Sequence, residues 1–364
     1  MIYLDYNATS PLRAEVKAAM FEVLGEPLNP SSIHKSGRAA RSLVEEAKAK
    51  IVAAVGGEKM IFCASGTEAN NFAIAQLREQ RAESRGQIII SAIEHDSVYR
   101  AAKNLTIISV DESGLVKLDE LEKALATRNS QLVSIILANN ETGVVQRMKP
   151  ISALCKKYGA LLHIDAVQAF GKIRLNMAEL GADMMTICAH KIGGPVGVAA
   201  LVFDPKLELV PFMRGGGQQQ GKRAGTEDVA AICGLAKLAD MLPEILLEAE
   251  KIRELRDYLE AEILRICPTA IIHSAAAPRL PNTSSIAMPN VAAATQLIHF
   301  DTHNIMLSSG AACSSGKVET SRILLAMGVA QAENSIRVSI GYKTTKAEID
   351  VFLGEWKALY ERLS

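Results

Sequence analysis

From about residue 36 to residue 242 the chain alternates between stretches of helical periodicity and short apolar runs, and this alternation limits the folds open to it. Strands are predicted at 60–63, 87–92, 132–138, 161–165, 184–188 and 197–203, and helices at 36–55, 67–80, 151–158 and 227–240. Short apolar strands separated by helices are typical of a mostly parallel sheet that helices cover on both faces. The sequence therefore predicts an α/β fold for this part of the chain.

After about residue 243 the pattern changes. Two long helical stretches, 243–266 and 346–363, flank short strands such as 284–287 and 336–340. Pro243 suits the first turn of a helix, so we expect a new helix to begin there. This mixture predicts a smaller α+β domain.

The chain has 364 residues, more than one ordinary core holds, so we expect two domains. We assign residues 12–245 to the large domain. Residues 1–11 together with 246–364 are assigned to the small domain.

Charge and cysteine usage exclude several classes of function. Forty basic residues balance forty acidic ones, which gives no electrostatic case for binding nucleic acid or an anionic membrane. No apolar stretch reaches the roughly 18 residues that a membrane span needs, and the N-terminus carries no signal-peptide pattern. The six cysteines are scattered without a C-x-x-C pair. That argues against a zinc site or a disulfide framework, so we expect no bound metal. It also favours a location in a reducing cytoplasm.

Polar residues gather where the predicted parallel strands end, which is where such sheets bind ligands. The small residues of 64–70 precede a helix, so the backbone N–H groups of Gly66 and Thr67 are suited to binding a phosphate. Ordinary capping of that helix by Ser65 or Thr67 explains the segment equally well.

Further polar residues follow three other predicted strands. Asp165 ends one strand and Gln168 follows it, although a carboxylate at that position also serves as a helix cap. Lys191 follows another strand, where burial would lower the pKa of its amine and make it a nucleophile, whereas most lysines simply lie on the surface. His95 follows a third. Together these residues match the needs of pyridoxal phosphate, which requires a lysine for a Schiff base and an aspartate to keep the pyridine nitrogen protonated.

Cys313 lies within nine small residues, 308–316, that include two glycines and no large apolar side chain. Free cysteine is normally a buried small hydrophobe, so a thiol on an open polar loop indicates reactivity. An incidental surface cysteine is the alternative.

The chain resembles the group I cysteine desulfurases, which are fold-type-I pyridoxal-phosphate enzymes of the iron–sulfur pathways. The resemblance runs from 4–9 to 335–339, and its most specific motif is the Ser-Ser-Gly-x-Ala-Cys-Ser-Ser-Gly loop around Cys313. It implies conversion of L-cysteine to L-alanine, with a persulfide on Cys313 that passes to an iron–sulfur scaffold or another sulfur acceptor.

The resemblance also implies a role for each site residue. Lys191 would carry the cofactor, Asp165 would pair with the ring nitrogen and Gln168 would bond the ring oxygen. His95 would stack on the ring and relay protons, and Arg337 would grip the substrate carboxylate through two hydrogen bonds. The remaining expected contacts are to the phosphate, from Gly66, Thr67 and His190, and to the ring and substrate, from Asn140.

Two positions depart from the family's pattern. Cys188 stands where a serine usually bonds the phosphate, and a thiol is a weaker donor. Gln218 stands where the family usually has an acidic residue after three glycines. Family members are dimers in which the residue matching Thr226 reaches the neighbour's phosphate, so the resemblance implies a homodimer.

One segment imitates a different site. Residues 216–223 nearly spell a nucleotide-binding P-loop, but Arg223 replaces the serine or threonine that would bind Mg²⁺. We therefore do not expect a nucleotide triphosphatase. Two further alternatives stay open: other chemistry on the same cofactor, such as selenocysteine lysis or transamination, and a non-catalytic partner that uses the fold as a scaffold.

Overall fold

A seven-stranded sheet forms the centre of the larger half of the protein, whose structure is a computed structural model describing residues 1–80, 87–127, 130–310 and 319–363. Its strand order is β2-β8-β7-β6-β5-β3-β4. The strands are β2 (Lys59–Cys63), β3 (Gln87–Ser91), β4 (Leu105–Ile108), β5 (Ser130–Ile136), β6 (Leu161–Asp165), β7 (Met184–Cys188) and β8 (Ala199–Phe203). β8 lies between β2 and β7 and runs antiparallel to both, while the other pairs of neighbouring strands are parallel. The mostly parallel sheet predicted from the sequence is confirmed.

Helices cover both faces of this sheet because its strands are apolar on both sides. In β2, Met60 and Phe62 join one core while Ile61 and Cys63 join the other, as the two-residue period of a strand requires. The first core contains residues of α2 (Lys35–Ala54), α5 (Leu118–Ala126), α6 (Met148–Tyr158) and the start of α8 (Val229–Ile266). The second is closed by α3 (Gly66–Gln80) and α4 (Asp96–Tyr99).

The smaller half is built on a three-stranded antiparallel sheet in the order β12-β10-β9, with a separate parallel pair, β1-β11. Its own apolar core includes Leu4, Phe300 and Trp356. The elements are β1 (Ile2–Tyr3), β9 (Ile271–Ile272), β10 (Thr283–Ala287), α9 (Ala293–Thr302), β11 (Ile305–Met306), β12 (Ser335–Ser339) and α11 (Lys346–Leu363). The other elements are α1 (Ala14–Phe21), α7 (Met177–Leu180) and α10 (Arg322–Met327), with short 3₁₀ turns at Gln218–Gly221 and Ala332–Asn334.

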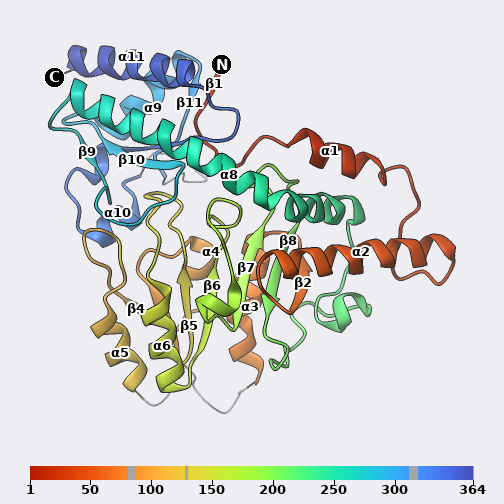
Figure 1. Ribbon diagram of the computed structural model, residues 1–364. Helices are drawn as coiled ribbons and strands as arrows, with labels where there is room; N and C mark the ends of the chain where they lie inside the picture. Colours follow the sequence, from red (N-terminus) through yellow and green to blue (C-terminus); the bar gives the residue numbers. More distant parts are fainter. Residues whose placement is uncertain (81–86, 128–129, 311–318, 364) are drawn as a thin grey trace.

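The helix α8 runs through both halves of the molecule (Figure 1). Its first part packs on α1 and α2, and its later part on α11 and β10. Ile245 belongs to the large core and Leu259 to the small one, so the boundary predicted after residue 245 falls inside one helix. α10, which lies beyond that boundary, packs into the large core. The domain limits therefore stay a prediction.

The prediction that a new helix begins at Pro243 is wrong. Residues 229–266 form one helix of 38 residues with Pro243 inside it. Pro243 lies on the exposed side, while Leu242 and Ile245 are buried against the large core. Packing of these apolar neighbours outweighs the lost backbone hydrogen bond and the steric cost of an internal proline. Long as α8 is, none of the helices described here has the apolar stretch needed to cross a bilayer.

Replacing Pro243 by alanine should stabilise the protein. The exposed position gains a backbone donor and loses a steric clash, which we expect to be worth about 1–3 kcal/mol in the free energy of unfolding. Urea unfolding followed by circular dichroism measures the change, and Glu244→Ala, at the next exposed position, serves as the control. A lower midpoint for Pro243→Ala alone would mean that the helix is interrupted at this point.

Candidate active site

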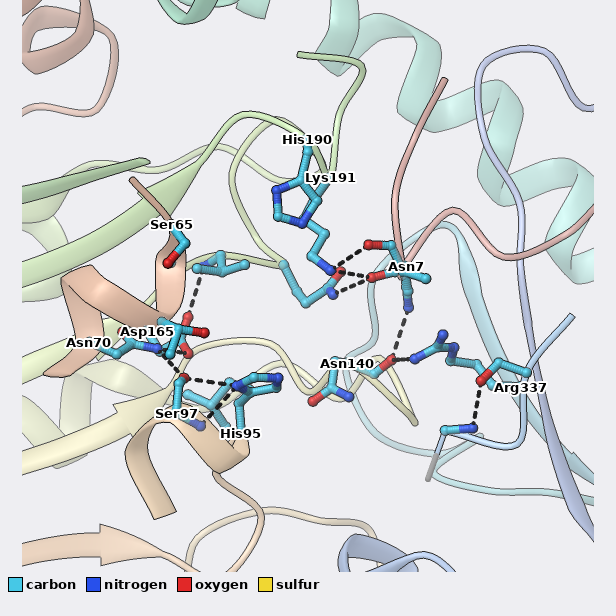
Figure 2. A pocket seen from close by; sticks show the side chains of 18 of the residues that line it. Asn7, Ser65, Asn70, His95, Ser97, Asn140, Asp165, His190, Lys191 and Arg337 are labelled. Carbon is cyan, nitrogen blue, oxygen red and sulfur yellow. Dashed lines mark hydrogen bonds between the residues drawn. The ribbon is translucent and has the colours of Figure 1, made fainter. Parts of the chain in front are cut away.

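A cavity of about 420 Å³ lies at the carboxyl ends of the parallel strands, where the two halves of the molecule meet. Loops that follow β3, β5, β6 and β7 supply one wall, and the N-terminal segment, β12 and the residues after β11 supply the other. Figure 2 shows Asn70, Ser97, His95 and Asp165 together on one side, with Arg337 beside Asn140 on another.

The cavity brings together most of the residues predicted from the sequence: Gly66, Thr67, His95, Asn140, Asp165, Gln168, His190, Lys191 and Arg337. Cys188 does not line it; the side chain is fully buried, and burial raises the pKa of its thiol to about 11. Thr226 is exposed and lies outside the cavity. Cys313 lies outside the described residues. Gly310, three positions before it, lines the cavity wall.

Asp165 is held at the end of β6 by two hydrogen bonds. Its Oδ2 accepts from Asn70 Nδ2 at 2.7 Å and its Oδ1 from the backbone N–H of Val167 at 2.9 Å. The alternative that Asp165 caps a helix does not hold, because turns follow it and the next helix is capped by Asn176. The carboxylate is therefore fixed in place and directed at the cavity.

A second buried carboxyl group, that of Glu94, lies close enough to Asp165 to interact with it electrostatically. Glu94 is fully enclosed after β3, and its Oε1 accepts from the backbone N–H of Ile136 at 2.9 Å. Burial raises the pKa of Glu94 to about 8, so its carboxyl group is mostly protonated at pH 7.

His95 presents one ring nitrogen to the cavity. The backbone N–H of Ser97 donates to its Nδ1 at 3.1 Å, so the proton of a neutral ring lies on Nε2. The Ser97 hydroxyl, 2.8 Å from Nδ1, also accepts from Asn70 at 2.8 Å. His95 and Asp165 are thus oriented by one shared set of contacts.

The N-terminus of α3 lies in the wall of the cavity. The first N–H groups of a helix have no acceptor within it and carry partial positive charge. Ser65 caps the helix through the N–H of Glu68 at 3.1 Å, so the capping predicted as an alternative is present. Gly66 has to be small, because a Cβ there would lie 2.9 Å from Val167 Cγ2. His190 lines the same cavity, and burial first, then the charge of Lys191, lowers the pKa of its ring to about 4.

Lys191 follows β7 on a turn that needs a glycine, since Gly193 has a φ of +91°. Its Nζ donates to the backbone oxygens of Asn7 and Ala8, at 2.8 and 2.7 Å (Figure 2). Burial is the main cause that lowers the pKa of this amine. The predicted combination of a strand-end lysine and partial burial is therefore present.

Sequence reasoning missed a second buried lysine, Lys172. Its Nζ donates to Gln168 Oε1 and to Asn7 Oδ1, each at 2.7 Å. Because Lys172 occupies the amide oxygen, the Nε2 end of Gln168 is the donor, and it bonds the backbone oxygen of Asn7 at 2.9 Å. Burial lowers the pKa of Lys172 well below its usual value. Its position four residues after Gln168, among small and apolar residues, was the available sequence signal.

Arg337 joins the two walls of the cavity. One of its terminal nitrogens bonds Asp5 at 2.5 Å and the other bonds the backbone oxygen of Asn140 at 3.0 Å. Among the described residues, Arg337 Nε and Asn140 Oδ1 are buried without a partner. These two atoms are a donor and an acceptor left for a polar ligand.

Comparison with known proteins identifies related chains. The model of the aminotransferase class-V family matches residues 2–352. A cysteine desulfurase IscS of Dictyoglomus turgidum is 38% identical over 375 residues, which cover all of this chain and 95% of that one. A cysteine desulfurase of Trichormus azollae is 39% identical over 376 residues, covering all of this chain and 94% of that one.

Solved structures show the same arrangement. The X-ray structure of a NifS-like protein from Rickettsia africae has a TM-score of 0.92 and 41% identity, with 99% of both chains covered. Another structure described as a NifS-like protein has a TM-score of 0.90 and 31% identity, with both chains fully covered.

Lys191 should react with an aldehyde at lower pH than an exposed lysine does. Burial lowers the pKa of Lys191, so more of its amine is neutral at pH 8 than at the ordinary pKa of a lysine. Exposed Lys103 serves as the comparison. Brief reductive methylation of cofactor-free protein, followed by peptide mass spectrometry across pH 7–10, measures the labelling midpoints. Lys172, which is enclosed, should stay unlabelled in the folded protein. A Lys191 midpoint equal to that of Lys103 would contradict the described environment.

Proposed function

The chain belongs to the aminotransferase class-V family, and we propose that it is a cysteine desulfurase that uses pyridoxal 5′-phosphate to convert L-cysteine to L-alanine. The observation that carries the proposal is that Lys191, Asp165 and Arg337 line one cavity, with Gly310 in its wall. Lysine and aspartate suit the cofactor, arginine suits an amino-acid carboxylate, and the segment after Gly310 supplies a thiol. Relatives named cysteine desulfurase, similar over the whole chain, support it.

The donor set of the cavity fits pyridoxal phosphate. An anionic phosphate suits the N-terminus of α3, and the fixed carboxylate of Asp165 suits a protonated ring nitrogen. When bound, this cofactor withdraws electrons from the substrate's α-carbon. The residues that would hold it are Lys191, Asp165, Gln168, His95, Asn140, Gly66, Thr67 and His190.

Lys191 is the proposed base. Burial keeps more of its amine neutral at physiological pH than in an exposed lysine, which is the form that removes a proton from the substrate's α-carbon. Lys191 would thus have two tasks, to carry the cofactor and to act as the base. Its contacts to the backbone oxygens of Asn7 and Ala8 hold the free amine beside the cavity when it is not joined to the cofactor. His95 Nε2, which carries a proton in the neutral ring, is the proposed relay.

Arg337 and Asn140 are proposed to fix the substrate. The free Nε of Arg337 and the free Oδ1 of Asn140 offer a donor to the carboxylate and an acceptor to an N–H group. Each terminal nitrogen of Arg337 carries two N–H groups, so its bonds to Asp5 and to the Asn140 backbone leave donors beside Nε for a carboxylate.

Cys313 is the proposed sulfur acceptor. Its thiolate forms a bond to the substrate sulfur while the bond between that sulfur and the β-carbon breaks, and the electron pair stays with carbon, which is then protonated to give alanine. In the sequence, Cys313 comes three positions after Gly310, which lies in the cavity wall. A persulfide on Cys313 then passes to an iron–sulfur scaffold protein or another sulfur acceptor.

We further propose a homodimer in a reducing cytoplasm. Thr226 is exposed and outside its own cavity, which suits a contact to the neighbour's phosphate. The five cysteines in the described residues are all free thiols, which a reducing compartment maintains. Selenocysteine lysis and transamination would use the same lysine and aspartate, so only Cys313 distinguishes the proposed reaction from them.

Asp165→Asn should keep the fold and lose most of the activity. A neutral amide cannot hold the pyridine nitrogen protonated, and we expect a fall in alanine formation of at least ~100-fold, on the scale of losing a preorganised electrostatic partner. Rates measured with saturating cofactor test this, and the melting temperature serves as the control for folding. A fall below about threefold would assign Asp165 a purely structural role.

Cys313→Ala should still bind the cofactor and cysteine but should stop forming alanine. The lost step is attack on the substrate sulfur and not binding. Mass spectrometry of the wild-type protein after brief exposure to cysteine should find one added sulfur on the peptide that carries Cys313. Cys233→Ala, which removes a partly exposed thiol elsewhere, is the matched control. Desulfuration at the wild-type rate by Cys313→Ala would refute the proposed reaction in favour of a lyase.

A further inference from the structure

We propose that the small domain contains a binding site for a divalent transition metal of the zinc type, formed by His299, His303 and Glu355. His299 and His303 are four residues apart at the end of α9, and Glu355 projects from α11. One ligand atom from each residue lies within 4.8 Å of the others. The cysteine pattern gave no reason to expect zinc, but these ligands are imidazoles and a carboxylate, which zinc also accepts.

The distances suit a metal better than a direct ion pair. The Nε2 atoms of His299 and His303 lie 3.3 and 3.4 Å from Glu355 Oε2. A charge-assisted hydrogen bond to a carboxylate would be about 2.7–2.9 Å long. In a tetrahedral zinc site with bonds of about 2.0–2.1 Å, neighbouring ligand atoms are roughly 3.3 Å apart. The two nitrogen–oxygen distances are therefore those of ligands around one ion, and the ligand atoms of the two histidines lie within 4.8 Å of each other.

The hydrogen bond made by His303 Nδ1 leaves Nε2 as the ring nitrogen that can bind a cation. Its Nδ1 lies 2.7 Å from the backbone oxygen of His299, and since a carbonyl can only accept, Nδ1 carries the proton. In the neutral ring, Nε2 then directs a lone pair at a carboxylate oxygen 3.4 Å away. Two facing lone pairs need a proton or a metal ion between them. A second ring nitrogen bonded to a backbone carbonyl is also the usual support of a metal-bound histidine.

Arg362 opposes metal binding at His299. Its Nη2 lies 3.4 Å from His299 Nδ1. Since a guanidinium can only donate, Nδ1 of His299 is the acceptor. His299 Nε2 lies 3.2 Å from the backbone oxygen of Glu355, which can only accept, so Nε2 carries the ring proton. A metal on Nε2 replaces this hydrogen bond and moves the ring proton to Nδ1, so Arg362 has to turn away. It is exposed on the last turn of α11 and free to do so.

Two imidazoles and one carboxylate leave a fourth position for water and select Zn²⁺, Co²⁺ or Ni²⁺ over Mg²⁺ or Ca²⁺, which prefer oxygen ligands. The ion would cross-link α9 to α11 in the small domain. This inference does not depend on the proposed function, because no residue of the cavity takes part.

The test is Zn²⁺ affinity, measured by competition with a chromogenic chelator. The full-length holoenzyme carries Cys313→Ala so that this thiol does not bind the ion. We expect one equivalent of zinc, bound at least tenfold more weakly after Glu355→Gln or His303→Asn. Asp301→Asn, which removes an exposed carboxylate of the same helix, should leave the affinity unchanged, and Arg362→Gln should tighten binding.

Two results would overturn the proposal. One is the absence of zinc binding in this background. The other is binding that Glu355→Gln and His303→Asn leave intact, which would place the ion elsewhere. Circular dichroism of each variant without metal separates loss of ligands from loss of fold.

Discussion

The contacts of Asn7 hold the cavity together, because they join elements that are far apart in the sequence. Its side-chain oxygen accepts from Lys172 at 2.7 Å and from Asn282 at 3.0 Å, and its amide donates to Thr283 at 2.8 Å. Its backbone oxygen accepts from Lys191 and from Gln168. One buried residue of the N-terminal segment thus connects the loops after β6 and β7 to the small sheet, and the positions of Lys172 and Lys191 depend on it.

Burial then distributes protons among groups of the same type. Of the two carboxyl groups near the cavity, Glu94 is raised to a pKa of about 8, while Asp165 is fixed by Asn70 and the backbone of Val167. Of the two lysines, Lys172 is buried away from the cavity and Lys191 reaches it, and burial lowers the pKa of both amines. Loss of water around a charged form thus favours the neutral form of Glu94 and of both lysines.

Local pattern explains which features were predictable from the sequence. Strands 161–165 and 184–188 were predicted with the observed limits because both faces of each are buried, which leaves continuous apolar runs. Asp165 and Lys191 follow from the rule that ligands bind at strand ends. The bond between Lys172 and Asn7 joins residues 165 positions apart, and no local pattern reports it. The sequence also gave no local signal that α8 continues through Pro243, because packing of the residues on both sides of the proline against the core determines it.

The uninterrupted course of α8 has a mechanical consequence. A helix of 38 residues is about 57 Å long, and it is anchored in both apolar cores. Rotating one half against the other would therefore have to bend this helix. Pro243, which lies between the two anchored parts and already lacks a backbone hydrogen bond, is the position where such bending breaks the fewest bonds.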